Sequence, residues 1–328
     1  MDMAKHEDLL PQKLCERLLL LYGTKEYRSL LKTISHSLPT TLRRNPNGSA
    51  SDRFDQALAT SGIMTTVVAW YPDARIVNTE NTTQSIGKTD GFQQGVFYVQ
   101  SLSSMIPPLV LDPQPGEKIL DLCASPGSKT TQLAGLIRNN GEIVANDVSY
   151  IRTLKLKANV RIQNATCVTC TNLPGEKLWT IYPEYFDKTL VDVPCSMEGT
   201  IRLDNPKTYE YWSEKKVKEL AKKQRWLLRS AISATKPGGT IVYSTCTISP
   251  EENEEVIDWI CQKEKGNIML EKIHIPGLET QPGIVSWKNH SYIPGVQSCI
   301  RIRSSDVMEG FFVAKIKKIR STVHGSFE

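Results

Sequence analysis

Ile119-Leu120-Asp121-Leu122-Cys123-Ala124-Ser125-Pro126-Gly127-Ser128-Lys129 combines a hydrophobic strand with a glycine-containing turn that leads into a helix. A helix N-terminus presents unpaired backbone N–H groups, which can bind an anion. Twenty residues after Gly127, Asp147 ends the next hydrophobic strand, where its carboxylate suits the paired hydroxyls of an adenosine ribose. The two features indicate a nucleotide-like cofactor. A tight turn at Gly127 and a helix cap at Asp147 are the structural alternative.

The composition of this turn narrows the choice of cofactor. It lacks the G-x-G-x-x-G pattern, which disfavours a nicotinamide cofactor. It also lacks the phosphate-binding loop pattern, because Ser128 precedes Lys129 and no glycine stands five residues earlier. A zwitterionic, adenosine-bearing cofactor such as S-adenosylmethionine fits a less glycine-dense turn. Lys129 could meet the carboxylate of that cofactor or help to order the site.

From about residue 104 onward, strand and helix patterns alternate. The pattern predicts strands at 118–121, 142–146, 165–170, 188–192, 240–244, 268–272 and 310–316, and helices at about 129–138, 150–162, 214–234 and 251–263. Such alternation indicates βαβ units and a parallel sheet. In an open parallel sheet, ligands bind beyond the carboxyl ends of the strands.

Two further predicted strands each end in a cysteine-containing polar turn. The first is Leu190-Val191-Asp192-Val193-Pro194-Cys195-Ser196, and the second is Ile241-Val242-Tyr243-Ser244-Thr245-Cys246-Thr247. Because the carboxyl ends of parallel strands share one edge, we expect both thiols to lie in one site with the cofactor turn. Buried cysteines that only fill space, or a disulfide between them, are the structural alternatives.

The first third of the chain has a different pattern. Helical spacing runs through residues 8–35 with a break at Gly23, and a short strand at 41–44 enters a turn at 45–48. A helical pattern resumes from Ser51 to Ile63, and strands are predicted at 67–71 and 95–100. We interpret residues 1–90 as a small α+β domain and residues 91–328 as the larger catalytic domain.

Composition bounds the class of protein. The chain has 328 residues, 40% hydrophobic and 23% charged, as in ordinary soluble globular proteins. No apolar run approaches the roughly 20 residues that cross a bilayer, and the first residues lack the features of a signal peptide. Eight cysteines without a secretory context favour reduced thiols. We therefore expect a cytoplasmic protein without membrane contact, with a nuclear or organellar site left open.

The chain resembles the Sun-type (nucleolar protein/Sun) RNA cytosine-C5 methyltransferases in an ordered set of motifs. These motifs lie at residues 42–45, 97–100, 120–131, 192–196, 243–247, 250–254 and 309–314, so the resemblance covers nearly the whole chain. It implies a Rossmann-like, S-adenosylmethionine-dependent methyltransferase sheet, mostly parallel with a C-terminal antiparallel strand. A small N-terminal α+β domain that binds RNA would accompany this sheet.

The resemblance also implies a mechanism. A thiolate that adds to C6 of cytosine makes C5 nucleophilic, and C5 then takes a methyl group before the thiol is eliminated, which is covalent catalysis. By analogy with the family, Cys246 is the nucleophile and Cys195 assists elimination and product release. Asp192 would face the polar edge of the base and select cytosine over uracil. Lys129 would stabilise developing charge or favour a nearby thiolate.

The same resemblance implies the residues that bind S-adenosylmethionine. These are Cys123, Ala124, Ser125, Pro126, Gly127, Ser128, Lys129, Asp147, Arg152, Asn172 and Asp192, and no metal ligand is expected. Some positions depart from the family pattern. Met197 replaces the usual glycine after Ser196, and Ser125 and Ser128 replace the commoner alanine and glycine. Asn172 stands where an aspartate often contacts the adenine amine, and its amide carbonyl can still accept.

An RNA substrate requires an unstacked base and phosphate contacts. Candidate contacts are Arg43 and Arg44, a basic stripe of Lys215, Lys218, Lys222, Arg225 and Arg229, and the tail residues Lys315, Lys317, Lys318 and Arg320. A solvated helix face is the alternative explanation of the stripe. We expect a monomer acting on ribosomal or transfer RNA, with a slight preference for ribosomal RNA. A DNA cytosine methyltransferase and a non-catalytic RNA-binding or assembly factor remain alternative functions.

Overall fold

The computed structural model describes residues 9–47, 53–78 and 86–323. The first residues, considered above for a signal peptide, lie outside the described part of the chain, as do Gly48 and the start of the helix predicted from Ser51. Within the described ranges, no helix combines the length and apolar character that crossing a membrane requires.

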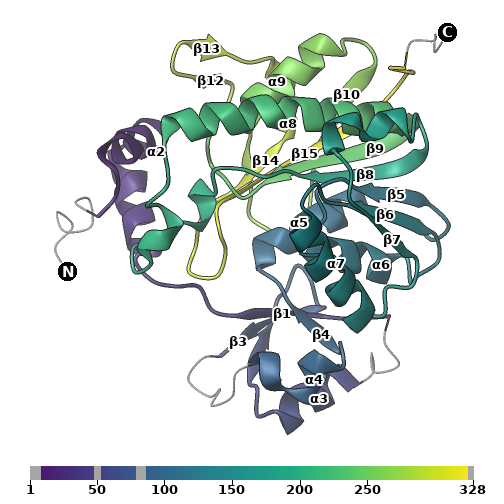
Figure 1. Cartoon of the computed structure of the whole chain (residues 1–328). Helices are drawn as coiled ribbons and strands as arrows, with labels where there is room; N and C mark the ends of the chain where they lie inside the picture. Colours follow the sequence, from purple (N-terminus) through teal and green to yellow (C-terminus); the bar gives the residue numbers. More distant parts are fainter. Residues whose placement is uncertain (1–8, 48–52, 79–85, 324–328) are drawn as a thin grey trace.

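A nine-stranded mixed sheet forms the larger part of the molecule (Figure 1). Its strand order is β11-β14-β15-β9-β8-β5-β6-β7, and β10 pairs with β15. The bounds are β5 Lys118–Asp121, β6 Glu142–Asn146, β7 Val168–Thr171, β8 Phe186–Asp192, β9 Thr235–Thr245, β10 Ile268–Glu271, β11 Gln281–Pro282, β14 Ile300–Ile302 and β15 Phe311–Lys318. Strands β5 to β9 pair in parallel, whereas β15 runs antiparallel to β9. The predicted mostly parallel sheet with an antiparallel C-terminal strand is confirmed.

Helices cover both faces of this sheet because its strands alternate apolar side chains on both sides. Leu120, Tyr243 and Phe312 pack with α8 (Glu214–Ala234) and α9 (Glu254–Lys263) on one face. Ile119, Val242 and Val313 pack with α5 (Leu102–Leu111) and α6 (Ser128–Leu136) on the other. Helix α7 (Tyr150–Ile162) lies beside α6, as Figure 1 shows. The predicted helices at 150–162 and 214–234 are confirmed to the residue.

Connections from the central strand β5 run in two directions. The chain proceeds from β5 to β6 and β7 on one side, and then returns to β8 and β9 on the other. A crevice forms at such a reversal, because the helices that follow neighbouring strands diverge to opposite faces. The carboxyl ends of β5, β6 and β8 therefore border the place where a ligand is expected.

The small N-terminal sheet is antiparallel, with the order β2-β3-β1-β4. Its strands are β1 Thr41–Arg44, β2 Thr65–Val67, β3 Ala74–Val77 and β4 Phe97–Val99, and the short helices α3 (Phe54–Thr60) and α4 (Asp90–Gln93) accompany it. The strand predicted at 67–71 is wrong. Strand β2 ends at Val67, and Val68 is buried in the core shared with α5, so this hydrophobic run fills the core instead of extending the strand.

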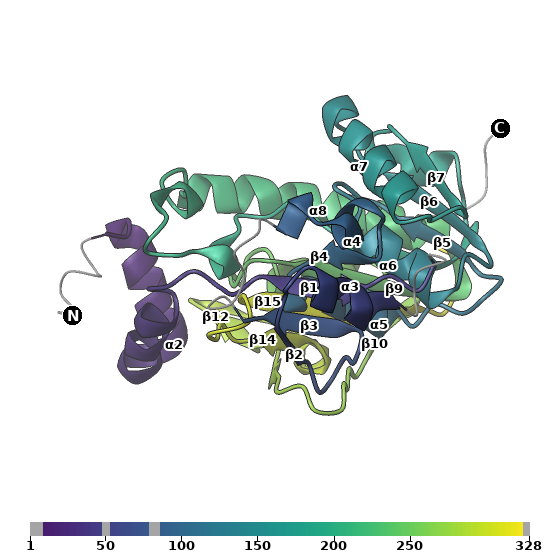
Figure 2. The same cartoon turned by 90° about the horizontal axis from the view of Figure 1, so that it is seen from below.

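Two features cross the proposed division at residue 90. Strand β4 lies beyond it yet pairs with β1 of the small sheet. Helix α2 (Gln12–Thr33), with its kink at Gly23, packs Leu14 and Leu18 against Ile201 and Ile248 of the larger part. Figures 1 and 2 both show α2 to one side, away from the small sheet. The first 90 residues thus contribute to three separate cores, that of the small sheet, that of α2 and the one shared with α5.

A buried ion pair fastens α2 to the turn that follows β9. Arg17 donates to both carboxylate oxygens of Glu251 at 2.8 Å and to Ser249 Oγ at 3.1 Å. Burial would raise the pKa of Glu251, but the hydrogen bonds and charge of Arg17 lower it from 4.5 to about 2. This pair is therefore a stabilising link whose strength depends on ionised Glu251.

We expect Arg17→Met to lower the free energy of unfolding at pH 7 by about 3 kcal/mol, since it removes the two short hydrogen bonds to Glu251 and leaves this carboxylate with a single ion pair among the described residues, the long contact with Lys288 at 3.9 Å. Because the pKa of Glu251 is lower in the folded protein than in the unfolded chain, the stabilisation is complete above about pH 4.5 and disappears as the pH falls toward 2. Urea unfolding between pH 7 and pH 3 measures both effects.

The matched control is Lys215→Met, which removes an exposed pair with Glu219 at 3.9 Å and should change stability by less than about 0.5 kcal/mol. An Arg17→Met protein as stable as the control would contradict this account of the pair.

Candidate active site

The two predicted thiols lie side by side. Strands β8 and β9 pair in parallel with Asp192 opposite Ser244, so the loops after the two strands are neighbours. Cys195 follows β8 and Cys246 follows β9, and their sulfur atoms are 3.3 Å apart. All eight cysteines are free thiols, so the disulfide alternative does not apply to this structure. The expected meeting of the two strand-end cysteines is confirmed.

The environment of Cys195 keeps this thiol protonated. Its hydrogen bond with Cys246, followed by burial, raises the pKa of Cys195 well above 9. Cys195 therefore remains a neutral thiol near pH 7 and can donate its S–H to the sulfur of Cys246. The 3.3 Å separation of the sulfurs allows this hydrogen bond, with either sulfur as the donor.

Lys129 and Asp192 form a buried ion pair close to the thiols. Lys129 Nζ lies 2.7 Å from Asp192 Oδ2 and 2.7 Å from Ser104 Oγ, while Ser244 Oγ donates to Asp192 Oδ1 at 2.7 Å. Burial lowers the pKa of Lys129. Asp192 and the neighbouring Cys246 together raise the pKa by more than burial lowers it, so the net shift is upward. The ammonium therefore keeps its charge in the low-dielectric interior, which holds Asp192 in a single orientation.

A cavity opens at the carboxyl ends of β5, β6 and β8, beside this ion pair. Its walls come from these strand ends, the start of α7 and the exposed side of α8. The lining residues are Leu122, Cys123, Ser125, Asn146, Asp147, Val148, Arg152, Gly175, Glu176, Asp192, Val193, Pro194, Lys223 and Leu227. The cavity lies where the reversal of strand order predicts a ligand.

The donors of this cavity fit an adenosine-bearing cofactor. Ser125 Oγ is buried in its wall and has no hydrogen-bond partner within the described ranges, so a ligand could satisfy it. Asp147 directly follows β6 and is held by Ser149 N at 2.9 Å and Arg152 Nη2 at 3.4 Å, which leaves it carboxylate lone pairs for ribose hydroxyls. Gly127 has a φ of 107° and precedes α6, as the predicted turn requires.

The predicted cofactor residues divide into two groups. Cys123, Ser125, Asp147, Arg152 and Asp192 line the cavity. Ala124, Pro126, Gly127 and Ser128 build the turn but do not line it, and Lys129 contacts Asp192 instead.

Asn172 also lies off the cavity wall. Its Nδ2 donates to the backbone oxygen of Asp147 at 2.6 Å, so the amide supports the loop that carries the ribose-binding candidate. Burial raises the pKa of the Cys123 thiol, so this cysteine stays protonated and serves as a wall of the cavity. Neither residue carries a group poised for chemistry.

Known proteins of similar sequence identify the family of this chain. Residues 108–317 match the model of the family described as 16S rRNA methyltransferase RsmB/F. This chain belongs to that family. Among curated relatives, a tRNA (cytosine(49)-C(5))-methyltransferase of Pyrococcus abyssi is 42% identical over 71% of this chain and 74% of its own length. A ribosomal RNA small subunit methyltransferase F of Escherichia coli is 33% identical over 97% of this chain.

Solved structures share the fold across nearly the whole RsmB/F-family chain. A methyltransferase homologue from Pyrococcus horikoshii superposes with a TM-score of 0.82 at 28% identity, covering 96% of this chain and 99% of its own. The crystal structure of PH0851 gives a TM-score of 0.84 at 29% identity, covering 97% and 68% of the two chains. This methyltransferase spans 65% of the length of the E. coli relative.

Two of the predicted RNA contacts of this methyltransferase are wrong because the side chains are buried. Arg43 is 1% exposed and donates to Gln100, Ser128 and Thr131, so it joins β1 to the cofactor turn instead of meeting phosphate. Lys318 is 0% exposed and donates to Glu184 and two backbone oxygens. The sequence shows that a residue is basic, but not whether its side chain is already paired with a group inside the protein.

The basic stripe of α8 is partly neutralised. Arg225 pairs with Glu255 at 2.7 Å and Arg229 with Glu264 at 3.7 Å, which leaves little free charge at the distal half. Lys218 and Lys222 are exposed in the N-terminal half of α8. The stripe can therefore attract a polyanion mainly at its N-terminal half.

Sequence reasoning missed several residues of the site. Ser104 of α5 holds Lys129, and no chemical pattern in its neighbourhood indicated this role. Glu176 and Lys223 face each other at 3.9 Å in the wall of the cavity, although they come from separate elements. Ser244 lies within the Cys246 motif without an assigned role, and its position opposite Asp192 in the parallel register is the signal that identifies it.

Lys129→Met should reduce kcat/KM for methyl transfer to RNA by at least about 100-fold, because Asp192 loses its charged partner in a water-poor site. Single-turnover transfer of labelled methyl groups measures the effect. The control Lys155→Met removes an exposed lysine of α7 and should leave the rate unchanged. Equal rates for the two variants would remove Lys129 from the active site.

Proposed function

We propose that this chain transfers a methyl group from S-adenosylmethionine to C5 of a cytosine in RNA through a covalent adduct with Cys246. The observation that carries the proposal is the 3.3 Å contact between the sulfurs of Cys195 and Cys246 beside the Lys129–Asp192 pair. Asp192 and Pro194 line the cavity, Lys129 pairs with Asp192, and Cys195 directly follows Pro194. The relative from P. abyssi is named for the same C5 chemistry on tRNA.

The proposed reaction forms one carbon–sulfur bond and later breaks it. The sulfur of Cys246 forms a bond to C6, and the electron pair of the C5–C6 double bond moves so that C5 becomes nucleophilic. When bound, S-adenosylmethionine supplies the methyl group that C5 accepts. Cys195, in hydrogen-bond contact with Cys246, would pass its S–H proton to the departing sulfur of Cys246 and take up the proton from C5 in its place. The double bond re-forms as the C6–sulfur bond breaks, and both cysteines end as thiols.

Asp192 and Lys129 would act on the base. Asp192 lines the cavity and is oriented from two sides, by Lys129 and by Ser244. A fixed carboxyl group at this position can bind the N3–N4 edge of cytosine, which uracil does not match. The positive charge of Lys129 would offset the negative charge that develops on the ring.

Substitution of the two thiols tests the mechanism. Cys246→Ala should abolish methylation, and Cys195→Ala should accumulate a covalent protein–RNA adduct because release fails. Labelled-methyl incorporation and denaturing gels measure the two outcomes. Cys261→Ala of α9, which removes a thiol elsewhere, should methylate normally.

Different outcomes of the same experiments would support the alternative functions or the reversed roles of the two cysteines. An adduct with Cys246→Ala and none with Cys195→Ala would reverse the roles, and full methylation by both variants would refute thiol catalysis. Methylation of DNA but not RNA would support a DNA enzyme, and RNA binding without any methylation would support an assembly factor. Mapping 5-methylcytosine in total RNA with and without the protein separates ribosomal from transfer RNA substrates.

RNA binding should depend on the exposed half of the α8 stripe. The double variant Lys218→Gln/Lys222→Gln should reduce the slope of log affinity against log salt concentration by about 1.5, since each phosphate contact contributes about 0.7 to 0.9. Filter binding across a salt series measures this slope.

Lys263→Gln/Lys265→Gln is the matched control, because it removes two exposed lysines outside α8. These lysines lie at the end of α9 and between α9 and β10. A wild-type slope for the Lys218/Lys222 variant, or a flat salt response of the wild type, would count against this surface.

A further inference from the structure

The turn between β9 and α9 contains polar side chains that are fully buried. Ser249, Glu252 and Asn253 are each 0% exposed, in a segment for which the thiol chemistry above has no role. A carboxylate removed from water is costly unless hydrogen bonds compensate for the lost hydration. The partners of these side chains therefore show what the turn does.

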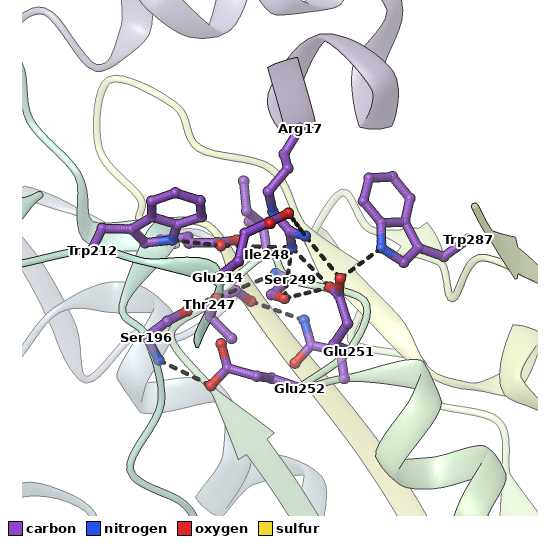
Figure 3. Close-up of polar contacts among 12 residues, drawn as sticks. Arg17, Ser196, Trp212, Glu214, Thr247, Ile248, Ser249, Glu251, Glu252 and Trp287 are labelled. Carbon is purple, nitrogen blue, oxygen red and sulfur yellow. Dashed lines mark hydrogen bonds and ion pairs between the residues drawn. The ribbon is translucent and has the colours of Figure 1, made fainter. Parts of the chain in front are cut away.

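Glu252 holds the loop of Cys195. Its Oε2 accepts hydrogen bonds from the backbone N–H of Ser196 at 2.9 Å and from Gln224 Nε2 at 2.8 Å (Figure 3 shows the contact with Ser196). Gln224 Nε2 also donates to the backbone oxygen of Pro194 at 2.9 Å. The residues on both sides of Cys195 are thus tied to one carboxylate, either directly or through Gln224.

Asn253 holds the loop of Cys246 in the same way. Its Oδ1 accepts from Thr245 Oγ1 at 2.6 Å, and its Nδ2 donates to the backbone oxygen of Thr247 at 3.0 Å. Thr245 and Thr247 are the two chain neighbours of Cys246. The consecutive residues Glu252 and Asn253 are therefore hydrogen-bonded, directly or through Gln224, to the chain neighbours on both sides of each cysteine.

The turn itself is anchored from three directions. Tyr243 donates its hydroxyl to the backbone oxygen of Glu252 at 2.6 Å. Figure 3 shows Arg17 of α2 and Trp287 converging on Glu251, and Trp287 Nε1 donates to it at 2.9 Å. At the far end, Arg301 binds both carboxylate oxygens of Glu254. A turn held in this way cannot shift without breaking several buried hydrogen bonds.

We propose that Glu252 and Asn253 are positioning residues that set the separation of the Cys195 and Cys246 sulfurs, an inference that rests on the proposed role of these thiols. Reactions between bound groups require atoms about 3–3.5 Å apart, and a misplacement of about 1 Å costs roughly 100-fold in rate. Neither side chain contacts the base or the cofactor in this proposal. Their effect on the reaction passes entirely through the two loops.

A different role for Glu252 is separable. Burial raises the pKa of Glu252 to about 7, and its Oε1 has no hydrogen-bond partner in the described part of the chain. A carboxyl group of this kind could instead exchange protons with the thiols. Glu252→Gln distinguishes the two roles, because the amide oxygen still accepts from Ser196 and Gln224 but cannot take up a proton at neutral pH.

The experiment compares Glu252→Gln, Glu252→Ala and Asn253→Ala in the full chain. Two readouts are used: single-turnover methyl transfer, and the rate at which diamide oxidises Cys195 and Cys246 to a disulfide, quantified by peptide mass spectrometry. Both alanine variants should lose about 100-fold in transfer rate and at least about 10-fold in disulfide formation. Glu252→Gln should stay within about 5-fold of wild type in both.

Glu264→Ala is the matched control, since it removes another buried carboxylate, at the far end of α9, and should leave disulfide formation unchanged. An inactive Glu252→Gln that forms the disulfide at the wild-type rate would overturn the proposal in favour of proton transfer. Wild-type disulfide formation in a folded Asn253→Ala would overturn it directly, even if Glu252→Ala does not fold. Since the disulfide readout does not depend on which thiol attacks cytosine, failure of the proposed function is recognised separately, by methylation that survives Cys246→Ala.

Discussion

Asp192 of β8 lies opposite Ser244 of β9, and the parallel register between these strands sets the position of both thiols. Side chains alternate along a strand, so a slip of one residue would turn Asp192 away from Ser244 and from Lys129. The long helix α8 makes the parallel pairing possible, because it carries the chain back across the sheet between the two strands. The site is thus a consequence of one crossover connection.

Buried charge gives the site its rigidity. Lys129 and Asp192 neutralise each other inside the protein, and Ser104 and Ser244 supply the remaining hydrogen bonds. An ion pair of this kind is costly to bury, so it contributes orientation more than stability. The pair Arg17–Glu251 differs in that it also stabilises the fold, since it connects α2 to the turn after β9 and lowers the pKa of Glu251. Both pairs lie close to the cysteine loops, where fixed geometry matters most.

Much of the fold and the core of the site could be predicted from the sequence. Hydrophobic runs separated by helical periodicity located β5, β6 and β8, and the polar turns after the strands located Cys195 and Cys246. The predictions that failed concerned residues whose partners are distant in sequence. Arg43 meets the cofactor turn 85 residues away, and Lys318 meets Glu184 134 residues away. Residue type signals a charge, but not whether an internal partner already binds it.

By itself, the sequence determined which elements form and which reactive groups stand at their ends, because those properties depend on local periodicity and turn chemistry. Only the tertiary structure decided how the groups combine. The 3.3 Å contact of the two sulfurs, the support of Lys129 by Ser104 and the grip of Glu252 on the Cys195 loop all join segments that lie 25 to 56 residues apart. Such distances arise from strand order and packing, which no short stretch of sequence encodes.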